Sequence, residues 1–431
     1  MSQKRLLWLG VLATLSVNTL HAQDIAGQWQ GTLKADSEDL RIIVQIAKGD
    51  GGGWKATLYS IDQTPDPFPV TSVTLDGSTL KLTVDSVQGA YEGKVSTDGN
   101  SIDGTWKQGE PLPLILRRAT KETAWPLDPS PHIVRFITVD GNVKLEVLDW
   151  GGSGRPVVLL TGLGNDAHVY DRFAPKLTGS YHVYGITRRG FGASSVPATG
   201  YSAHRLGDDV LVVLDSLKLN RPVLVGHSIG GEELSSVGSR HPERVAGLIY
   251  LDAAYEYAYY DRARGDFEVD LVELREMLEQ LQPGKREKDP RPLIQEMLET
   301  ILPRFERDLR EEQADLQARP AAWLAAHQPK PWPVPEQAIM AGLQKYTEIP
   351  VPALAIYALP HDVGEVAGDD AAARSAIEAR DEITTGAQAK AFEKGVPSAR
   401  VVRLPHANHF VFLSNEADVL REMNAFIATL P

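Results

Sequence analysis

Alternating hydrophobic and polar positions define the first part of the chain. Short alternating runs between residues 26 and 117 are separated by turn residues such as Asp50-Gly51-Gly52-Gly53, a pattern typical of half-buried strands joined by tight turns. The pattern predicts an all-β meander or small barrel over residues 24–118. The expected strands include residues 40–44, 80–84 and 112–116, and three tryptophans, Trp29, Trp54 and Trp106, supply bulk for a small core.

A second pattern begins after a proline-containing segment. Residues 119–132 include Pro126, Pro129 and Pro131, and closely spaced prolines favour a stiff linker over regular pairing. From residue 133 to residue 431, apolar runs alternate with helical or turn segments, which predicts a mostly parallel sheet with helices on both faces. The expected strands are residues 143–150, 157–160, 181–186, 223–225, 248–251, 354–357 and 401–404.

The alternation stops between residues 255 and 349, where charge-rich helical patterns take over. We expect a helical cap inserted after one strand, with its charges on a solvated face. Four tyrosines follow that strand, and they fit either the lining of a substrate pocket or the packing of the cap. They are Tyr255, Tyr257, Tyr259 and Tyr260.

The first 22 residues carry the pattern of a secretory signal peptide. Lys4 and Arg5 precede the apolar residues 6–15, and Ala22 ends a plausible cleavage site. The apolar stretch is short for a bilayer span, and no later stretch is long enough for one either. We therefore expect cleavage after Ala22 and export to the periplasm or beyond, with no membrane span in the mature protein.

Composition removes several function classes. The formal net charge is −13 at pH 7, which argues against nucleic acid as a partner. The chain has no cysteine, so thiol catalysis, cysteine–metal sites and disulfides are excluded.

The sequence Gly226-His227-Ser228-Ile229-Gly230 lies between an apolar run and a predicted helix over residues 229–239. A serine on such a strand-to-helix turn has a strained backbone and an outward hydroxyl, and the flanking glycines permit the close approach of strand and helix. The positive end of the helix dipole also favours the negative charge that develops in acyl transfer. Ser228 is therefore the predicted nucleophile.

A serine hydroxyl needs a general base, and the base needs a third group that fixes its orientation. His409 lies between the last predicted strand and the terminal helix, and Asp362 follows the strand at 354–357. The sequence favours these two, with three rivals left open. His406 competes for the base, and Asp252 and Glu256 compete for the acid.

The order Ser228, Asp362, His409 gives residues 133–430 a resemblance to the α/β-hydrolases with an inserted cap. The stretch Arg189-Gly190-Phe191-Gly192 is similar to that family's R-G-x-G-x-S loop, although Thr187 replaces the usual aspartate. The loop Thr161-Gly162-Leu163-Gly164 lacks the histidine found first in many members. The resemblance implies an oxyanion hole formed by the backbone N–H groups of Leu163 and Ile229.

These features predict a serine hydrolase that cleaves a small-molecule carboxylic ester through an acyl-enzyme, without a cofactor. An H-x-x-H string ending at His409, together with His361-Asp362, allows a zinc site as an alternative, but the triad accounts for His409 and Asp362 more economically. The same residues also fit a peptidase or amidase, a lactonase, or a binding protein without turnover. The β segment resembles modules found ahead of exported bacterial serine hydrolases. Its tryptophans allow two interpretations: they bind a polymer or surface ligand, or they only fill the core.

Overall fold

The computed structural model describes residues 24–34, 39–49, 51–62, 67–108, 111–128, 130–285, 289–318, 332–362 and 371–431. The predicted signal peptide lies outside these residues. The chain divides into two compact units that separate between Leu127 and Asp128.

The first unit is a curled antiparallel sheet whose strands run in the order β4-β3-β2-β1-β9-β8-β7-β6-β5. Trp29 and Trp106 are buried in its core, and Trp54 packs against that core partly buried. The tryptophans therefore serve the interior. The elements are β1 (Gly27–Lys34), β2 (Asp39–Lys48), β3 (Trp54–Ser60), β4 (Phe68–Pro69), β5 (Ser72–Asp76), β6 (Thr79–Val84), η1 (Asp85–Val87), β7 (Gly89–Val95), β8 (Ser101–Lys107) and β9 (Pro111–Arg118).

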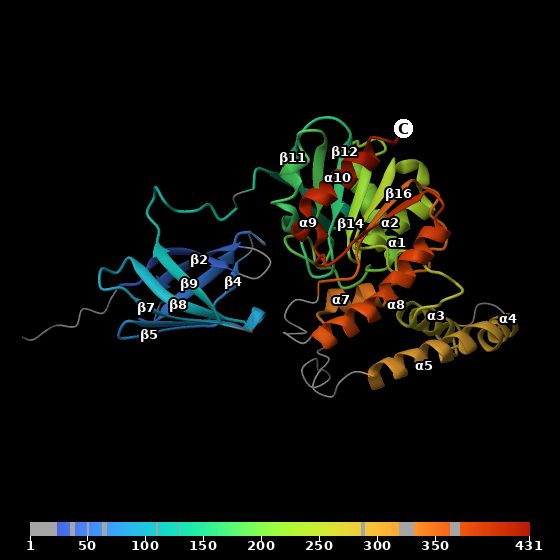
Figure 1. The fold of residues 1–431 in the computed structure, drawn as a ribbon, viewed down its shortest axis with the longest axis horizontal. Helices are drawn as coiled ribbons and strands as arrows, with labels where there is room; N and C mark the ends of the chain where they lie inside the picture. The colour runs from blue at the N-terminus through green and yellow to red at the C-terminus, as the bar shows by residue number, and fades with distance from the viewer. Residues whose placement is uncertain are drawn as a thin grey trace, which may run out of the picture. The chain divides into compact units, whose positions relative to one another are not determined.

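The second unit is built on an eight-stranded sheet in the order β10-β11-β13-β12-β14-β15-β16-β17 (Figure 1). The pairs β10–β11 and β11–β13 are antiparallel, and the other pairs are parallel, so the expected mostly parallel sheet is present. The strands are β10 (Ile133–Asp140), β11 (Val143–Gly151), β12 (Pro156–Leu160), β13 (His182–Ile186), β14 (Val223–His227), β15 (Gly247–Leu251), β16 (Ala353–Ala358) and β17 (Ala399–Leu404).

Both faces of this sheet are covered, because successive strand residues point to opposite sides. In β12, Val158 and Leu160 belong to one apolar core, whereas Val157 and Leu159 belong to the other. Residues of α1 (Ala203–Ser216), α2 (Gly230–Arg240) and α8 (Ala371–Gly395) complete the first core. Residues of η2 (Ala167–Tyr170), η3 (Ala174–Lys176), α9 (Val411–Ser414) and α10 (Glu416–Ile427) complete the second, and η4 (Pro242–Arg244) precedes β15.

The segment between β15 and β16 forms the cap, and Figure 1 shows α3, α4 and α5 gathered outside the sheet. An apolar cluster that includes Leu274, Met277 and Ile301 joins its helices. The elements are α3 (Phe267–Gln280), α4 (Arg291–Glu296), the π-helix η5 (Met297–Ile301), α5 (Leu302–Ala318) and α7 (Val334–Met340). None of the described helices is both long and apolar enough to cross a membrane.

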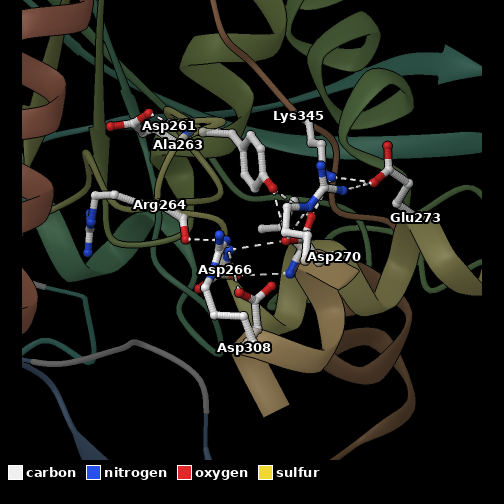
Figure 2. Close-up of polar contacts among 12 residues, drawn as sticks. Asp261, Ala263, Arg264, Asp266, Asp270, Glu273, Asp308 and Lys345 are labelled. Atoms are coloured by element: carbon white, nitrogen blue, oxygen red, sulfur yellow. Dashed lines mark hydrogen bonds and ion pairs between the residues drawn. The ribbon is translucent and has the colours of Figure 1, made fainter. Parts of the chain in front are cut away.

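One part of the cap differs from the expected solvated face. The Asp270 side chain is fully buried and accepts hydrogen bonds from Tyr260 Oη at 2.7 Å and from Arg304 Nε at 2.9 Å. Lys345 pairs with Asp270 and Glu273, and Figure 2 shows these side chains converging. A buried carboxylate is tolerated because it is paired. The charged residues of the cap segment therefore form a buried polar cluster as well as exposed surface.

Candidate active site

Ser228 occupies the turn between β14 and α2 with φ of 50°. This left-handed backbone costs a non-glycine residue about 1 to 3 kcal/mol and persists only where the surrounding structure enforces it. The enforcement comes from close packing. A Cβ on Gly226 would lie 2.7 Å from Gly230 O, and one on Gly231 would lie 2.0 Å from Ala253 O. The turn therefore presents Ser228 at the carboxyl edge of the sheet.

The backbone N–H groups of Ile229 and Leu163 are the predicted oxyanion donors. Ile229 immediately precedes α2, and Leu163 lies in the loop after β12. Neither N–H donates a hydrogen bond to another described residue. Gly164, which follows Leu163, has φ of 79°, a conformation that glycine adopts without strain. Both donors are therefore available to a carbonyl oxygen that becomes negative.

Arg188 supports the loop that carries Leu163. Its Nη2 donates to Thr161 O at 2.7 Å and its Nη1 donates to Gly162 O at 3.3 Å, while its Nε donates to Glu233 Oε1 at 2.6 Å. The Arg188 and Glu233 side chains are almost fully buried. Arg188 therefore joins the oxyanion loop to α2. No sequence pattern pointed to this role, because the R-G-x-G-x-S motif begins one residue later, at Arg189.

The side chains of the R-G-x-G-x-S stretch connect it to neighbouring elements through hydrogen bonds. Arg189 pairs with Asp209 through two hydrogen bonds of 2.6 and 2.8 Å. Ser194 Oγ donates to Thr187 O at 2.7 Å, and Thr187 Oγ1 donates to Glu146 at 2.7 Å. The threonine in place of aspartate thus retains a polar connection to β11.

His409 lies in the loop between β17 and α9, and its carboxylate partner is Asp252. The Nδ1 atom of His409 lies 2.7 Å from Asp252 Oδ2. Asp252 follows β15 directly with φ of 46°, and its side chain is fully buried. Its other oxygen, Oδ1, accepts a 3.0 Å hydrogen bond from Ala358 N. A hydrogen on Nδ1 leaves Nε2 of His409 to accept a proton.

The preference for Asp362 over Asp252 is corrected by this geometry. Asp362 is exposed, and its backbone N donates to Ala407 O at 2.8 Å. The preceding residue, His361, forms a parallel bridge to Ala407, so the chain after β16 pairs with the chain after β17. This pairing carries Asp362 past the position from which a carboxylate contacts His409. The other rival, Glu256, lies 3.6 Å from Arg264 in an ion pair.

A second histidine contacts the same carboxylate. His361 Nε2 lies 2.9 Å from Asp252 Oδ2, and His361 Nδ1 lies 2.9 Å from Asp381 Oδ2. Although burial opposes it, hydrogen bonding to both carboxylates raises the pKa of His361 to about 10. Although burial also opposes ionisation of Asp252, hydrogen bonding to His361 and His409 lowers the pKa of Asp252 to about 2. Asp252 is therefore held as an anion.

His227 supports the loop that carries the base. Its Nε2 lies 3.1 Å from His409 O, and its ring lies 4.6 Å from that of His409 and 4.7 Å from that of Phe410. Burial, followed by the nearby His409, lowers the pKa of His227 to about 3, so this ring is neutral. The rival base His406 instead faces Glu378 at 3.6 Å and is largely exposed.

The four tyrosines divide between the site and the cap. Tyr257 packs against the apolar cluster that contains Ile229, the residue after Ser228, and Tyr255 Oη lies 3.3 Å from His361 Nε2. Tyr259 and Tyr260 are buried in apolar clusters. Tyr255 and Tyr257 therefore lie beside candidate site residues, whereas Tyr259 and Tyr260 serve packing.

The structure brings together a different set of potential metal ligands from the set that the sequence suggested. Asp252, His361 and His409 place one potential ligand atom each within 4.8 Å of one another. The exposed Asp362 and His406, which the H-x-x-H interpretation needed, are outside this group. The two imidazoles share one carboxylate oxygen, an arrangement that also matches a histidine oriented by a buried aspartate.

Comparison with known proteins identifies relatives. The Alpha/beta hydrolase family matches residues 157–422, more than half of the chain. A 2-(acetamidomethylene)succinate hydrolase from Mesorhizobium japonicum is 26% identical over 123 residues, which cover 28% of this chain and 44% of that protein. Epoxide hydrolase A from Mycobacterium tuberculosis is 35% identical over 121 residues, which cover 27% of this chain and 37% of that protein. The chain thus spans less than half the length of these curated relatives.

Among solved structures, an enol-lactonase from Burkholderia xenovorans is 20% identical with a TM-score of 0.44, and the match covers 68% of this chain and 100% of that one.

Proposed function

Because this chain belongs to the alpha/beta hydrolase family, we propose that it is a serine hydrolase that cleaves carboxylic esters through an acyl-enzyme intermediate. One observation carries the proposal. Ser228 has the strained backbone of a nucleophile turn, in the same unit as a histidine whose Nδ1 lies 2.7 Å from a buried aspartate. These three groups can supply a nucleophile, a base and an orienting anion.

The proposed reaction has two halves. His409 Nε2 takes the Ser228 proton as Oγ attacks the ester carbonyl carbon, and the N–H groups of Leu163 and Ile229 stabilise the oxyanion. The tetrahedral intermediate collapses, and the leaving alcohol receives the proton from His409. Water then attacks the acyl-enzyme, giving its proton to His409, and a second collapse releases the carboxylic acid and restores Ser228.

Asp252 is the proposed orienting group. It fixes the His409 hydrogen on Nδ1 and stabilises the imidazolium that forms when Nε2 accepts a proton. Its ionised state follows from the contact with His361, and Asp381 anchors that second histidine. We assign His361 and Asp381 as positioning residues.

The amidase and lactonase alternatives use the same groups, so the leaving group decides among them. The peptidase alternative needed a free acidic residue in the cap to hold a substrate amine. Glu256 is the candidate for that role, and its pairing with Arg264 gives the peptidase alternative less support than the ester. A binding protein without turnover would not require the strained serine or a histidine paired with a buried aspartate.

Export is also proposed. Residues 1–22 have the signal-peptide pattern, and we propose that the mature chain begins after Ala22. Intact mass of the protein recovered from the cell envelope or medium tests this.

A surface or polymer ligand for the β unit is a separate proposal, which binding of that unit to insoluble polysaccharide would test.

A panel of p-nitrophenyl esters of increasing acyl length tests the reaction. We expect turnover by the wild type and background rates for Ser228→Ala, with a fluorophosphonate probe labelling only the wild type at Ser228. Matched p-nitroanilides and lactones form the second arm. An active Ser228→Ala variant, or faster anilide than ester cleavage, would overturn the esterase proposal.

A further inference from the structure

Four metal-ligating side chains meet in the second unit, apart from every residue given a role above. Asp128 and His132 lie just before β10, and His168 and Asp171 lie in η2 and directly after it. Each offers one ligand atom, and these four atoms all lie within 4.8 Å of one another. None of them belongs to the Ser228, His409 and Asp252 group.

The spacing inside this cluster suits a small cation. His132 Nε2 lies 3.1 Å from Asp128 Oδ2, and His132 Nδ1 lies 3.0 Å from Asp171 Oδ1. His168 Nδ1 lies 2.9 Å from Asp171 Oδ2. Ligands bound tetrahedrally at about 2.0 to 2.1 Å are separated by about 3.3 Å, so small side-chain shifts suffice to place a metal between them.

The His132 ring is the second observation. Its side chain is only 1% exposed, and both ring nitrogens are buried without a hydrogen-bond partner. The nearby carboxylate oxygens are within ion-pair distance but not in hydrogen-bond geometry, and Asp171 Oδ1 also lacks a hydrogen bond. Buried polar atoms without partners are costly. A metal bound by one nitrogen of His132 would remove part of this cost.

The surroundings hold the ligands in place. Ser130 N donates to Asp128 Oδ1 at 3.1 Å, and Trp150 Nε1 donates to Ser130 Oγ at 2.8 Å. Glu146 Oε1 lies 3.6 Å from His168 Nε2, the ring nitrogen that faces away from the cluster. A carboxylate behind a histidine ligand orients the ring and increases its basicity.

The surrounding charge also favours a cation. The carboxylates of Asp128, Asp171 and Glu146 each lie within 3.6 Å of an imidazole nitrogen of the cluster. A divalent ion would offset this negative charge and bind the deprotonated imidazoles.

We propose that Asp128, His132, His168 and Asp171 bind one divalent transition-metal ion, with zinc as the best fit. Two imidazoles and two carboxylates match the tetrahedral N/O preference of zinc, whereas calcium and magnesium prefer oxygen ligands. The ion fastens the segment before β10 to η2. Its role is structural, because its ligands are separate from the groups assigned to ester cleavage.

The experiment uses the mature full-length protein, stripped with a chelator and then given zinc or calcium before desalting. Elemental analysis should find one zinc per chain and no retained calcium. The double variant His132→Gln/His168→Gln should retain no zinc, whereas His182→Gln should retain one. His182 is the matched control because it pairs with Asp149 outside the cluster.

Two further variants keep the outcome decisive. His361→Gln tests the group of Asp252, His361 and His409, and its zinc content should equal that of the wild type. If the double variant fails to fold, Asp128→Asn replaces it, since the Asp128 side chain is 34% exposed. Zinc should raise the melting temperature of the wild type by several degrees and that of Asp128→Asn by much less. Absence of bound zinc in the wild type, retention by the double variant, or loss confined to His361→Gln would overturn the proposal.

Discussion

At the scale of single residues, the candidate site is organised around one buried carboxylate. Asp252 Oδ2 contacts two histidines, while Oδ1 accepts from the backbone of Ala358. A buried anion needs such partners, because removal from water otherwise favours the neutral acid. The same contacts that stabilise the charge also fix the orientation of His409.

Replacement of the carboxylate by an amide tests which aspartate acts. Asp252→Asn should lower kcat for ester hydrolysis on the order of 10³- to 10⁴-fold, because the amide favours the wrong histidine tautomer. Asp362→Asn should have a kcat close to that of the wild type. Steady-state kinetics of both variants, with circular dichroism to check folding, makes the comparison. A larger loss in Asp362→Asn than in Asp252→Asn would contradict the assignment.

His361 should make stability depend on pH. Its pKa in the folded protein is raised to about 10, above the value of about 6.5 expected in the unfolded chain. The protonated ring therefore contributes stability that is fully present below about pH 6.5 and is lost as pH rises through about 10. His361→Gln should remove this part of the alkaline loss, which urea unfolding at several pH values measures.

The catalytic readout for His361→Gln is the pH profile of kcat/KM. A positioning role predicts a changed profile, because the charge beside Asp252 is removed. An unchanged profile in a destabilised variant would assign His361 to stability alone.

At the scale of elements, the site depends on where strands end. β12, β14, β15 and β17 each lead into a loop that carries a candidate group: Leu163, Ser228, Asp252 and His409. The carboxyl ends of parallel strands lie at one edge of a sheet, so distant parts of the sequence meet there. Arg188 then ties the first of these loops to α2.

Gly164 provides a test of the oxyanion loop. Its φ is 79°, and a Cβ added there meets no atom within 4 Å. Gly164→Ala therefore introduces backbone strain of about 1 to 2 kcal/mol without a steric clash, and relief of that strain should move the Leu163 N–H. We expect kcat to fall about tenfold with little change in KM, since part of a donor worth about 3 kcal/mol is lost.

The matched control is Gly179→Ala. A Cβ there also meets nothing, and Gly179 is not among the residues with positive φ. Its kinetics should equal those of the wild type. Equal kcat for Gly164→Ala and Gly179→Ala would argue that the loop does not supply a donor.

At the scale of the whole molecule, the two units have separate apolar cores. The core around Trp29 contains only residues of the β unit, and the two cores on either side of the eight-stranded sheet contain only residues of the second. All candidate catalytic groups lie in the second unit. Each unit should therefore fold with its own cooperativity.

A shortened protein that begins at Asp128 tests this independence. We expect its kcat on p-nitrophenyl esters to match that of the mature chain within about twofold, because no core or site residue is removed. Calorimetry of the mature chain should show one transition more than the shortened protein. A folded but inactive shortened protein would mean that the β unit contributes to turnover.

The sequence by itself determined the main features of the second unit. Apolar runs between helical segments, the glycine-flanked serine and the histidine before the terminal helix have local causes, namely buried strands, a turn that needs small neighbours and the order of loops. The elbow at Ser228, the family and the mostly parallel sheet were therefore predictable.

Only the tertiary structure decided which acidic side chain meets His409. Asp252 and Asp362 each follow a strand, and sequence spacing does not distinguish them. The left-handed backbone at Asp252 and its bond to the end of β16 aim its carboxylate at His409, whereas pairing of His361 and Asp362 with Ala407 carries Asp362 past it. The meeting of Asp128 and His132 with His168 and Asp171 was decided in the same way. Contacts between residues distant in sequence depend on how strands and loops are arranged in space, which local patterns do not encode.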